Sequence, residues 1–208
     1  MPKSAVIVAN GTPPRPAILR RELECADFIL AADGGANHLI TVGIEPHAVI
    51  GDFDSIDTAL PGAIPRIHAP DQNRTDLEKA VNYCRTEGYG AITLIAATGD
   101  RLDHTFAALA LVCKYSLRLV DDRGEAVCVR GPGQLTLAIE PVRTVSLMPC
   151  GPVKGLTTKG LKWDLQGADF SFAERDGTSN VAGCSPVEVS VESGYLLVYT
   201  HHASDEQY

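Results

Sequence analysis

The sequence predicts an α/β protein in two parts: a mostly parallel, Rossmann-like α/β sheet domain at residues 1–124, followed by an all-β sandwich domain at residues 125–208. Two observations lead to this prediction. In the first part, continuous apolar runs alternate with helical patterns, which is typical of a parallel sheet covered by helices on both faces. After Gly124 the apolar residues recur at every second position, which indicates antiparallel strands.

Four short apolar runs are expected to form the strands of the first domain, at residues 5–9, 28–31, 48–50 and 91–97. Each of them stops at a turn signal; these are Asn10-Gly11, Asp33-Gly34-Gly35, Gly51-Asp52 and Thr98-Gly99. Because the runs contain almost no alternating polar residues, we expect strands that are buried on both faces.

Three helices are expected between and after these strands. Residues 36–42 have a helical pattern that stops at Gly43, ahead of Pro46. Residues 75–84 begin with a capping box, Thr75 with Glu78, and place their apolar side chains on one face. A third helix is expected at residues 104–113, with Asp103 as its N-cap.

The second part has alternating apolar residues in three segments, namely Leu135, Leu137 and Ile139; Val145 and Leu147; and Val187, Val189 and Val191. Turn residues at 131–133 and 149–152 separate them. This pattern, without a helical segment, predicts the small β-sandwich.

The composition limits the partners. The chain of 208 residues has a net charge of −8, and its densest basic cluster, Arg15, Arg20 and Arg21, lies beside two glutamates. Such a chain repels nucleic acid and anionic membranes, so we expect neither as a partner. No apolar run approaches the ~20 residues of a membrane span, and the first residues do not resemble a signal peptide. We expect a cytoplasmic protein.

Six cysteines are spread through the chain, and no C-x-x-C pair is present. Most of them stand in apolar surroundings, such as Cys113 after Leu111-Val112. We expect small buried hydrophobic side chains in a reducing compartment.

Acidic residues follow the carboxyl ends of the predicted strands; they are Asp33, Asp52, Asp54, Asp100 and Asp103. In an open parallel sheet these ends line the ligand crevice, and Asp76, at a helix start, points towards the same edge. Carboxylates that converge beside glycine-rich turns suit a polyphosphate bound with Mg²⁺, which prefers hard oxygen ligands.

Each residue also has a purely structural interpretation. Asp76 can complement the helix dipole, Asp103 can cap a helix, and His104 can be a partly buried histidine with a satisfied hydrogen bond. Gly34-Gly35 can be an ordinary strand-to-helix turn. It is the set of acidic residues at one end of the sheet that favours a site. No P-loop, zinc-peptidase or serine-hydrolase motif is present.

Four ordered motifs resemble the thiamine pyrophosphokinase family. They are Ala32-Asp33-Gly34-Gly35-Ala36, Gly51-Asp52-Phe53-Asp54-Ser55, Thr75-Asp76 and Arg101-Leu102-Asp103-His104. In the second part, Gly160-Leu161-Lys162-Trp163-Asp164-Leu165 and Ser179-Asn180 resemble the thiamine-binding domain of the family. The chain departs from the family pattern at Asn73, at Asp100 and after Asn180.

The resemblance implies a kinase that transfers the pyrophosphoryl group of ATP to thiamine, with Mg²⁺ as cofactor and AMP as the second product. It implies a homodimer with active sites between the subunits. The implied catalytic residues are Asp52, Asp54, Asp76, Arg101 and Asp103, the first three as metal ligands. The implied ATP-binding residues are Asn10, Gly11, Asp33, Gly34, Gly35, Thr75, Arg101 and His104. The implied thiamine-binding residues are Gln72, Trp163, Ser179 and Asn180; packing in the β core is the alternative for Trp163.

Two other functions fit the same fold. One is a pyrophosphokinase for another acceptor, such as hydroxymethylpterin, from which only the second domain distinguishes a thiamine enzyme. The other is a non-catalytic nucleotide- or thiamine-binding regulator, which predicts the loss of acidic residues that this chain retains.

Overall fold

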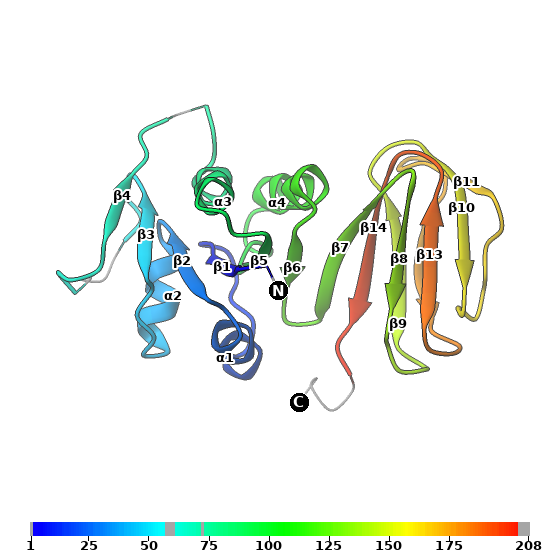
Figure 1. Ribbon diagram of the computed structural model, residues 1–208, viewed down its shortest axis with the longest axis horizontal. Helices are drawn as coiled ribbons and strands as arrows, with labels where there is room; N and C mark the ends of the chain where they lie inside the picture. The colour runs from blue at the N-terminus through cyan, green and yellow to red at the C-terminus, as the bar shows by residue number, and fades with distance from the viewer. Residues whose placement is uncertain (1, 57–60, 72, 204–208) are drawn as a thin grey trace. The chain divides into compact units, whose positions relative to one another are not determined.

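The computed structural model describes residues 2–56, 61–71 and 73–203 (Figure 1). The chain divides into two compact units. Unit 1 comprises Met1–Leu111 and Leu119–Asp122, and unit 2 comprises Val112–Arg118 and Arg123–Tyr208. No helix within the described part of the chain has the length and apolar composition that a membrane span requires.

Unit 1 is built on a sheet whose strands lie in the order β6-β5-β1-β2-β3-β4. β1 pairs in parallel with β2 and β5, and β3 pairs in parallel with β2 and β4. The strands are β1 (Ser4–Val8), β2 (Phe28–Ala32), β3 (Ala48–Gly51), β4 (Arg66–His68), β5 (Ala91–Ile95) and β6 (Arg118–Val120).

Helices cover both faces of this sheet, as the continuous apolar strands predict. α1 (Pro16–Glu24) and α2 (Gly35–Thr41) lie on one face, and α3 (Asp76–Thr86) and α4 (Leu102–Tyr115) lie on the other (Figure 1). The core under α1 and α2 contains Leu19, Leu23 and Leu39 against strand residues such as Val8 and Ala31. The parallel α/β architecture expected from the sequence is therefore confirmed.

Two local expectations need correction. α4 begins at Leu102, so Asp103 lies in the first turn of the helix and is not its N-cap. The carboxylate of Asp103 instead accepts hydrogen bonds from Arg101 and from the backbone N–H of His104. In addition, α1 and the three-residue strands β4 and β6 were not expected from the apolar pattern.

Unit 2 is a sandwich of two antiparallel sheets, which confirms the second part of the predicted fold. One sheet has the order β12-β9-β14-β7 and the other β11-β10-β13-β8. Side chains from both sheets form one core, with Leu147 and Leu196 from the first and Leu156 and Val189 from the second. The strands are β7 (Gly124–Arg130), β8 (Gly133–Leu137), β9 (Thr144–Pro149), β10 (Val153–Lys159), β11 (Ala168–Phe170), β12 (Gly177–Val181), β13 (Val187–Val191) and β14 (Tyr195–His201).

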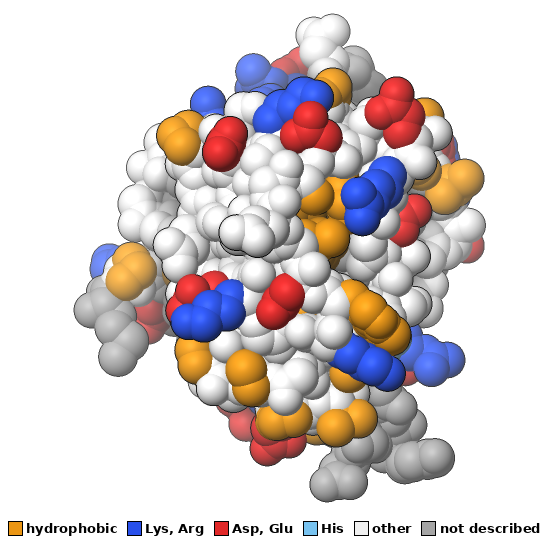
Figure 2. All heavy atoms as spheres, turned by 90° about the vertical axis from the view of Figure 1, so that its right-hand side faces the viewer, with side chains coloured by type: hydrophobic (Ala, Val, Ile, Leu, Met, Phe, Trp, Pro, Cys, Tyr) orange, Lys and Arg blue, Asp and Glu red, His pale blue; other side chains and the backbone are white. Residues whose placement is uncertain are grey.

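Charged side chains of both signs are interspersed on the face drawn in Figure 2, with apolar side chains between them. Several large apolar side chains are exposed in the described residues. They are Leu102, Phe106, Val142, Trp163, Phe172 and Tyr195. Of these, Leu102 and Trp163 belong to motifs singled out in the sequence.

Candidate active site

A cavity of unit 1 lies where the strand order reverses. β2, β3 and β4 extend from one side of β1, whereas β5 pairs with its other side. In such sheets the ligand crevice forms outside the carboxyl ends of the strands at this reversal. A cavity of about 250 Å³ is found there, lined by Asn10 and Gly11 after β1 and by residues 96–101 after β5.

The loops around this cavity are packed backbone against backbone. The Gly11 N–H donates to the Ala96 carbonyl at 2.7 Å, and the Thr12 N–H donates to the Thr98 carbonyl at 2.9 Å. A Cβ atom on Gly11 would lie 2.6 Å from the carbonyl oxygens of Ala96 and Thr98. Only glycine fits here, because backbone atoms of a second loop occupy the space of a side chain.

Strained backbone gathers in these loops. Asp33, Phe53, Ala96 and Asp100 all have positive φ, although none of them is glycine. A non-glycine residue in this conformation costs free energy and is retained where the surrounding structure enforces it, most often at functional sites. Each of the four follows the carboxyl end of a strand of unit 1.

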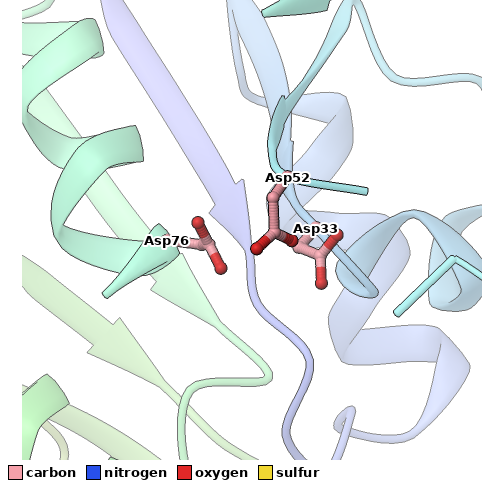
Figure 3. Close-up of side chains that lie close together, drawn as sticks. All are labelled: Asp33, Asp52 and Asp76. Atoms are coloured by element: carbon pink, nitrogen blue, oxygen red, sulfur yellow. The ribbon is translucent and has the colours of Figure 1, made fainter. Parts of the chain in front are cut away.

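Three carboxylates converge at this edge of the sheet (Figure 3). Asp33 follows β2, Asp52 follows β3, and Asp76 is the first residue of α3. One carboxylate oxygen from each of them lies within 4.8 Å of the other two. Hard oxygen ligands at this spacing can share a divalent cation such as Mg²⁺.

Asp33 is the buried member of this cluster, with 6% of its surface exposed. Burial raises the pKa of its carboxyl group, and the neighbouring carboxylates of Asp76 and Asp54 raise it further, against hydrogen bonds from Ser55 and Gly34. Its Oδ1 atom is buried and has no hydrogen-bond partner among the described residues. A cation bound here would supply the missing partner and offset the repulsion between the carboxylates.

Asp76 is held by a residue that the sequence did not point to. The Nζ atom of Lys79, whose side chain is 8% exposed, lies 2.9 Å from the Asp76 Oδ1 atom. The two residues are three positions apart on α3, so they share one helix face. Lys79 thereby holds one carboxylate oxygen of Asp76 in place beside the cluster.

Asp54 lies outside the group of three. Two residues apart in an extended chain, Asp52 and Asp54 would lie on the same side, but Phe53 between them has a φ of 69°. The Asp54 carboxylate accepts a hydrogen bond from the Ser55 hydroxyl at 2.9 Å, and its backbone N–H points to Asp52. The structure thus puts Asp33 where the sequence suggested Asp54 as the third carboxylate.

Arg101 and Asp103 form an exposed, two-pronged ion pair beside the cavity. The Arg101 Nε and Nη2 atoms lie 3.1 and 2.6 Å from the two Asp103 oxygens. This contact lowers the pKa of Asp103. It uses one edge of the guanidinium group and leaves the Nη1 atom for another ligand. Arg101 and His104 line the cavity, as do Thr75 and Asp76.

The remaining predicted nucleotide residues support the cavity. Gly34 is the N-cap of α2, and Gly35 is its first residue. A Cβ atom on Gly34 would lie 2.4 Å from the side chain of Asn10. His38 on α2 is hydrogen-bonded to the backbone of Gly11, and its burial lowers the pKa of its ring. His38 and Lys79 were not selected from the sequence, because neither belongs to a motif; Ser55 ends the Gly51–Ser55 motif but was not assigned a role.

In unit 2, Trp163 lies in the turn after β10 and is 55% exposed. This exposure excludes packing in the β core, the alternative left open by the sequence. Asn180 is buried and holds the backbone of Trp163: its Oδ1 accepts from the Trp163 N–H at 3.3 Å, and its Nδ2 donates to the Trp163 carbonyl at 2.8 Å. Ser179 is exposed on β12, and Gln72 lies outside the described residues.

Asp164 shapes the turn that carries Trp163. Its carboxylate accepts hydrogen bonds from the backbone N–H groups of Gly160 and Leu161 and from the Thr158 hydroxyl, at 3.0–3.2 Å. The Nζ atom of Lys162 lies 4.6 Å from the centre of the Trp163 ring. The sequence motif from Gly160 to Leu165 is therefore a hydrogen-bonded turn with an exposed aromatic side chain.

Comparisons with known proteins agree with this arrangement. Residues 19–120 match the family "Thiamin pyrophosphokinase, catalytic domain", and residues 135–196 match "Thiamin pyrophosphokinase, vitamin B1 binding domain". The chain is 26% identical to thiamine pyrophosphokinase from Bacillus subtilis over 182 residues, which cover 81% of this chain and 85% of that relative. It is 25% identical to thiamin pyrophosphokinase 1 from Caenorhabditis elegans over 190 residues, covering 83% and 78%.

Solved structures give the same result. The crystal structure of thiamine pyrophosphokinase from Bacillus subtilis has a TM-score of 0.83 at 25% identity and covers 96% of this chain and 99% of that chain. Yeast thiamin pyrophosphokinase, with a TM-score of 0.79 at 16% identity, covers 99% and 88% and shows the shared fold. The two matched regions lie one in each part of the chain and follow the family order; the chain belongs to the thiamine pyrophosphokinase family.

Proposed function

We propose that the protein transfers the pyrophosphoryl group of ATP to the hydroxyethyl group of thiamine, giving thiamine diphosphate and AMP. The observation that carries the proposal is the group of three carboxylates beside the cavity at the strand reversal. The family match supports thiamine as the acceptor, because its second part is the vitamin B1 binding domain. The other acceptor, hydroxymethylpterin, and the non-catalytic regulator are not favoured.

A divalent cation fits the carboxylate group. Asp33, Asp52 and Asp76 offer oxygen ligands, and the buried Asp33 Oδ1 atom lacks a partner among the described residues. Mg²⁺ usually takes one or two carboxylates and completes its shell with water and phosphate oxygens. When bound, it neutralises charge on the polyphosphate. Asp54 remains close to the cation site without being one of the three ligands. The Ser55 hydroxyl connects it to the site, because Ser55 contacts both Asp54 and Asp33.

The nucleotide is assigned to the cavity of unit 1. The backbone N–H groups of Asn10 and Gly35 are suited to phosphate oxygens, whereas the N–H of Gly11 bonds to Ala96 and that of Gly34 to the Asp33 carboxylate. Arg101, oriented by Asp103, presents its Nη1 edge to a phosphate, where the planar guanidinium gives two hydrogen bonds. Thr75 and His104 complete the lining.

The reaction is a displacement at the β-phosphorus. The hydroxyl oxygen of thiamine forms a bond to this atom while the bond to the bridging oxygen of AMP breaks, and AMP leaves with that oxygen. The hydroxyl proton passes to a carboxylate of the cluster. Most of the rate enhancement in such reactions comes from positioning of the reacting groups and stabilisation of charge. Lys79 contributes to the positioning because its ion pair fixes the carboxylate of Asp76.

Thiamine binding is assigned to the turn around Trp163. The exposed indole ring can stack on the pyrimidine ring or face the thiazolium cation, each worth about 0.5–2 kcal/mol. Asn180 fixes the backbone of Trp163, and Ser179 and Gln72 are further proposed contacts. We also propose a cytoplasmic homodimer in which the turn of one subunit serves the cavity of the other.

Release of AMP with different acceptors tests the function. The protein is incubated with ATP and Mg²⁺ and with thiamine, hydroxymethylpterin or no acceptor. AMP and thiamine diphosphate are expected with thiamine only. AMP release with hydroxymethylpterin instead would identify the other acceptor, and the absence of AMP in all three reactions would support a regulator. The Asp76→Asn variant, prepared in the same way, is the control for a contaminating kinase. Its kcat should be at least ~100-fold lower, whereas the activity of a contaminant would be unchanged.

A further inference from the structure

Three cysteines far apart in the sequence meet on one side of unit 2. In β7, Val127 and Val129 pack against the sandwich core, so Cys128 points to the opposite face of the sheet. Cys128 is in register with Leu197, and Leu197 with Met148, two residues before Cys150. The alternation of side chains therefore places Cys128 and Cys150 on the same outer face.

The end of α4 brings the third thiol to this face. The Sγ atom of Cys113 lies 3.6 Å from the Sγ atom of Cys150, and Cys113 is also hydrogen-bonded to Cys128. Cys113 is thus the central member of the cluster and is buried, whereas Cys150 is exposed and Cys128 half-buried. The expectation that the cysteines are small buried side chains holds for Cys84 and Cys113 and is wrong for the other four.

The arrangement suits sulfur chemistry better than a metal ion. Within the described residues, only Asp33, Asp52 and Asp76 bring three ligand atoms within 4.8 Å of one another, so the two outer thiols are too far apart to share an ion with Cys113 as they stand. A disulfide needs only one close pair of sulfur atoms, and Cys113 has a thiol neighbour on each side.

We propose that Cys113, Cys128 and Cys150 form a peroxide-oxidation site that ends in a disulfide between Cys113 and Cys150. The Cys128 thiolate attacks an oxygen of the peroxide, the O–O bond breaks, and a sulfenic acid and water (or an alcohol) result. The sulfur of Cys113 then displaces water from the sulfenic sulfur and forms a disulfide with Cys128. Finally, the sulfur of Cys150 loses its proton to water and attacks Cys113, the bond between Cys113 and Cys128 breaks, and Cys128 leaves as a thiolate. Two thiols are oxidised and one peroxide is reduced.

The ionisation of the thiols supports this order. The hydrogen bond from Cys113 lowers the pKa of Cys128, so Cys128 is the member of the cluster that ionises first and reacts first with an oxidant. The same bond raises the pKa of Cys113 to about 12, and the contact with Cys113 raises that of Cys150. A thiol of low pKa is also the better leaving group, which moves the disulfide from Cys128 to Cys150.

The test maps the disulfide after oxidation of the intact protein. The exposed Cys25 and Cys184 are first replaced, Cys25→Ser and Cys184→Ser, so that links between chains through these residues are excluded. The protein is treated with hydrogen peroxide, its remaining thiols are alkylated, and unreduced peptides are identified by mass spectrometry. We expect one link, between the peptides of Cys113 and Cys150, with the loss of two hydrogen atoms.

Single replacements then test each role. Cys113→Ser should abolish every link, Cys150→Ser should leave a link between Cys113 and Cys128, and Cys128→Ser should slow the formation of the link between Cys113 and Cys150. The same treatment in urea, which removes the proximity, should give far less of this link. A link between Cys128 and Cys150, an equal yield in urea, or three alkylated thiols after oxidation would overturn the proposal.

Discussion

Among single residues, Asp33 is the one whose carboxyl group lowers the stability of the metal-free fold and at the same time serves the proposed cation site. It is buried beside two other carboxylates, and its pKa is raised because burial disfavours the charged form. A raised pKa means that the folded state binds this proton more tightly than the unfolded state does. The ionised group therefore destabilises the fold at neutral pH unless a cation is bound.

Asp33→Asn should accordingly raise the melting temperature of the metal-free protein and abolish its activity. Addition of Mg²⁺ should raise the melting temperature of the wild type, because a ligand that binds only the native state stabilises it, and should leave that of Asp33→Asn unchanged. Glu24→Gln, at an exposed site on α1, is the control and should behave as the wild type in both respects. An equal response of Asp33→Asn to Mg²⁺ would remove Asp33 from the cation site.

Trp163 is the second residue with a separable role. Because its ring is exposed and its backbone is held by Asn180, Trp163→Ala should leave the fold intact. It should raise the KM for thiamine several-fold to tens of fold, as expected for the loss of about 1–2 kcal/mol of stacking or cation–π attraction. The KM for ATP should change little.

Steady-state kinetics with each substrate varied in turn measure this difference. Quenching or a shift of the emission of this single tryptophan on titration with thiamine gives an independent measurement. Equal increases of both KM values, or emission that thiamine leaves unaltered, would argue for a structural role of the turn.

At the scale of the element, the close approach of α2 to β1 places the turn at Asp33-Gly34-Gly35 against the loop after β1. A Cβ atom on Gly35 would lie 2.0 Å from the carbonyl oxygen of Val8. Gly35→Ala should therefore push α2 away from the sheet, lower the melting temperature and weaken ATP binding, because packed cores do not absorb an added methyl group.

Gly62→Ala is the matched control for this variant. Apart from its chain neighbours, no atom of the described residues lies within 4 Å of a Cβ atom on Gly62, so the replacement should be neutral. Thermal unfolding and the KM for ATP measure both variants. A Gly35→Ala protein with the stability and the ATP affinity of the Gly62→Ala protein would show that the close approach of α2 is not needed.

The elements also show how much of the fold the sequence could predict. β1, β2, β3 and β5 were predicted because their apolar runs are continuous and end in turn residues. α1 was not predicted, since its short apolar face of Ile18, Leu19 and Leu23 is interrupted by Glu22. β10 and β12 were missed because Thr157, Thr158 and Ser179 show no apolar alternation. For these strands, pairing with distant segments decides the structure.

The same limit applies to the candidate site. The ends of the strands could be located, so Asp52 and Asp76 were found to belong together. The third carboxylate could not be chosen, because the positive φ of Phe53 turns Asp54 away. Nor could Lys79 be found, since an ion pair on a helix is common on solvated faces and only its burial distinguishes this one.

For the whole molecule, mixing two variants tests whether the proposed homodimer builds each active site from both subunits. If the cavity of one subunit uses the Trp163 turn of its partner, a dimer formed from Asp76→Asn and Trp163→Ala subunits has one intact site. The other active site of this dimer contains both altered residues and is inactive.

Mixing the two variants under conditions that exchange subunits should therefore restore about one quarter of the activity of the wild type, if the subunits associate at random. The assay uses thiamine well below the KM of the Trp163→Ala protein, so that each variant alone, as the control, is far less active than the wild type. Activity that equals the sum of the two separate variants would place each complete site within a single subunit.

The most direct test of the central claim follows the two phosphates that leave ATP. ATP labelled at the β-phosphorus is incubated with Mg²⁺, thiamine and the protein, and the products are separated. We expect the label in thiamine diphosphate, on the phosphate esterified to thiamine, together with an equal amount of unlabelled AMP. Label retained in ADP, with thiamine monophosphate as the other product, would contradict it, because the attack would then occur at the γ-phosphorus.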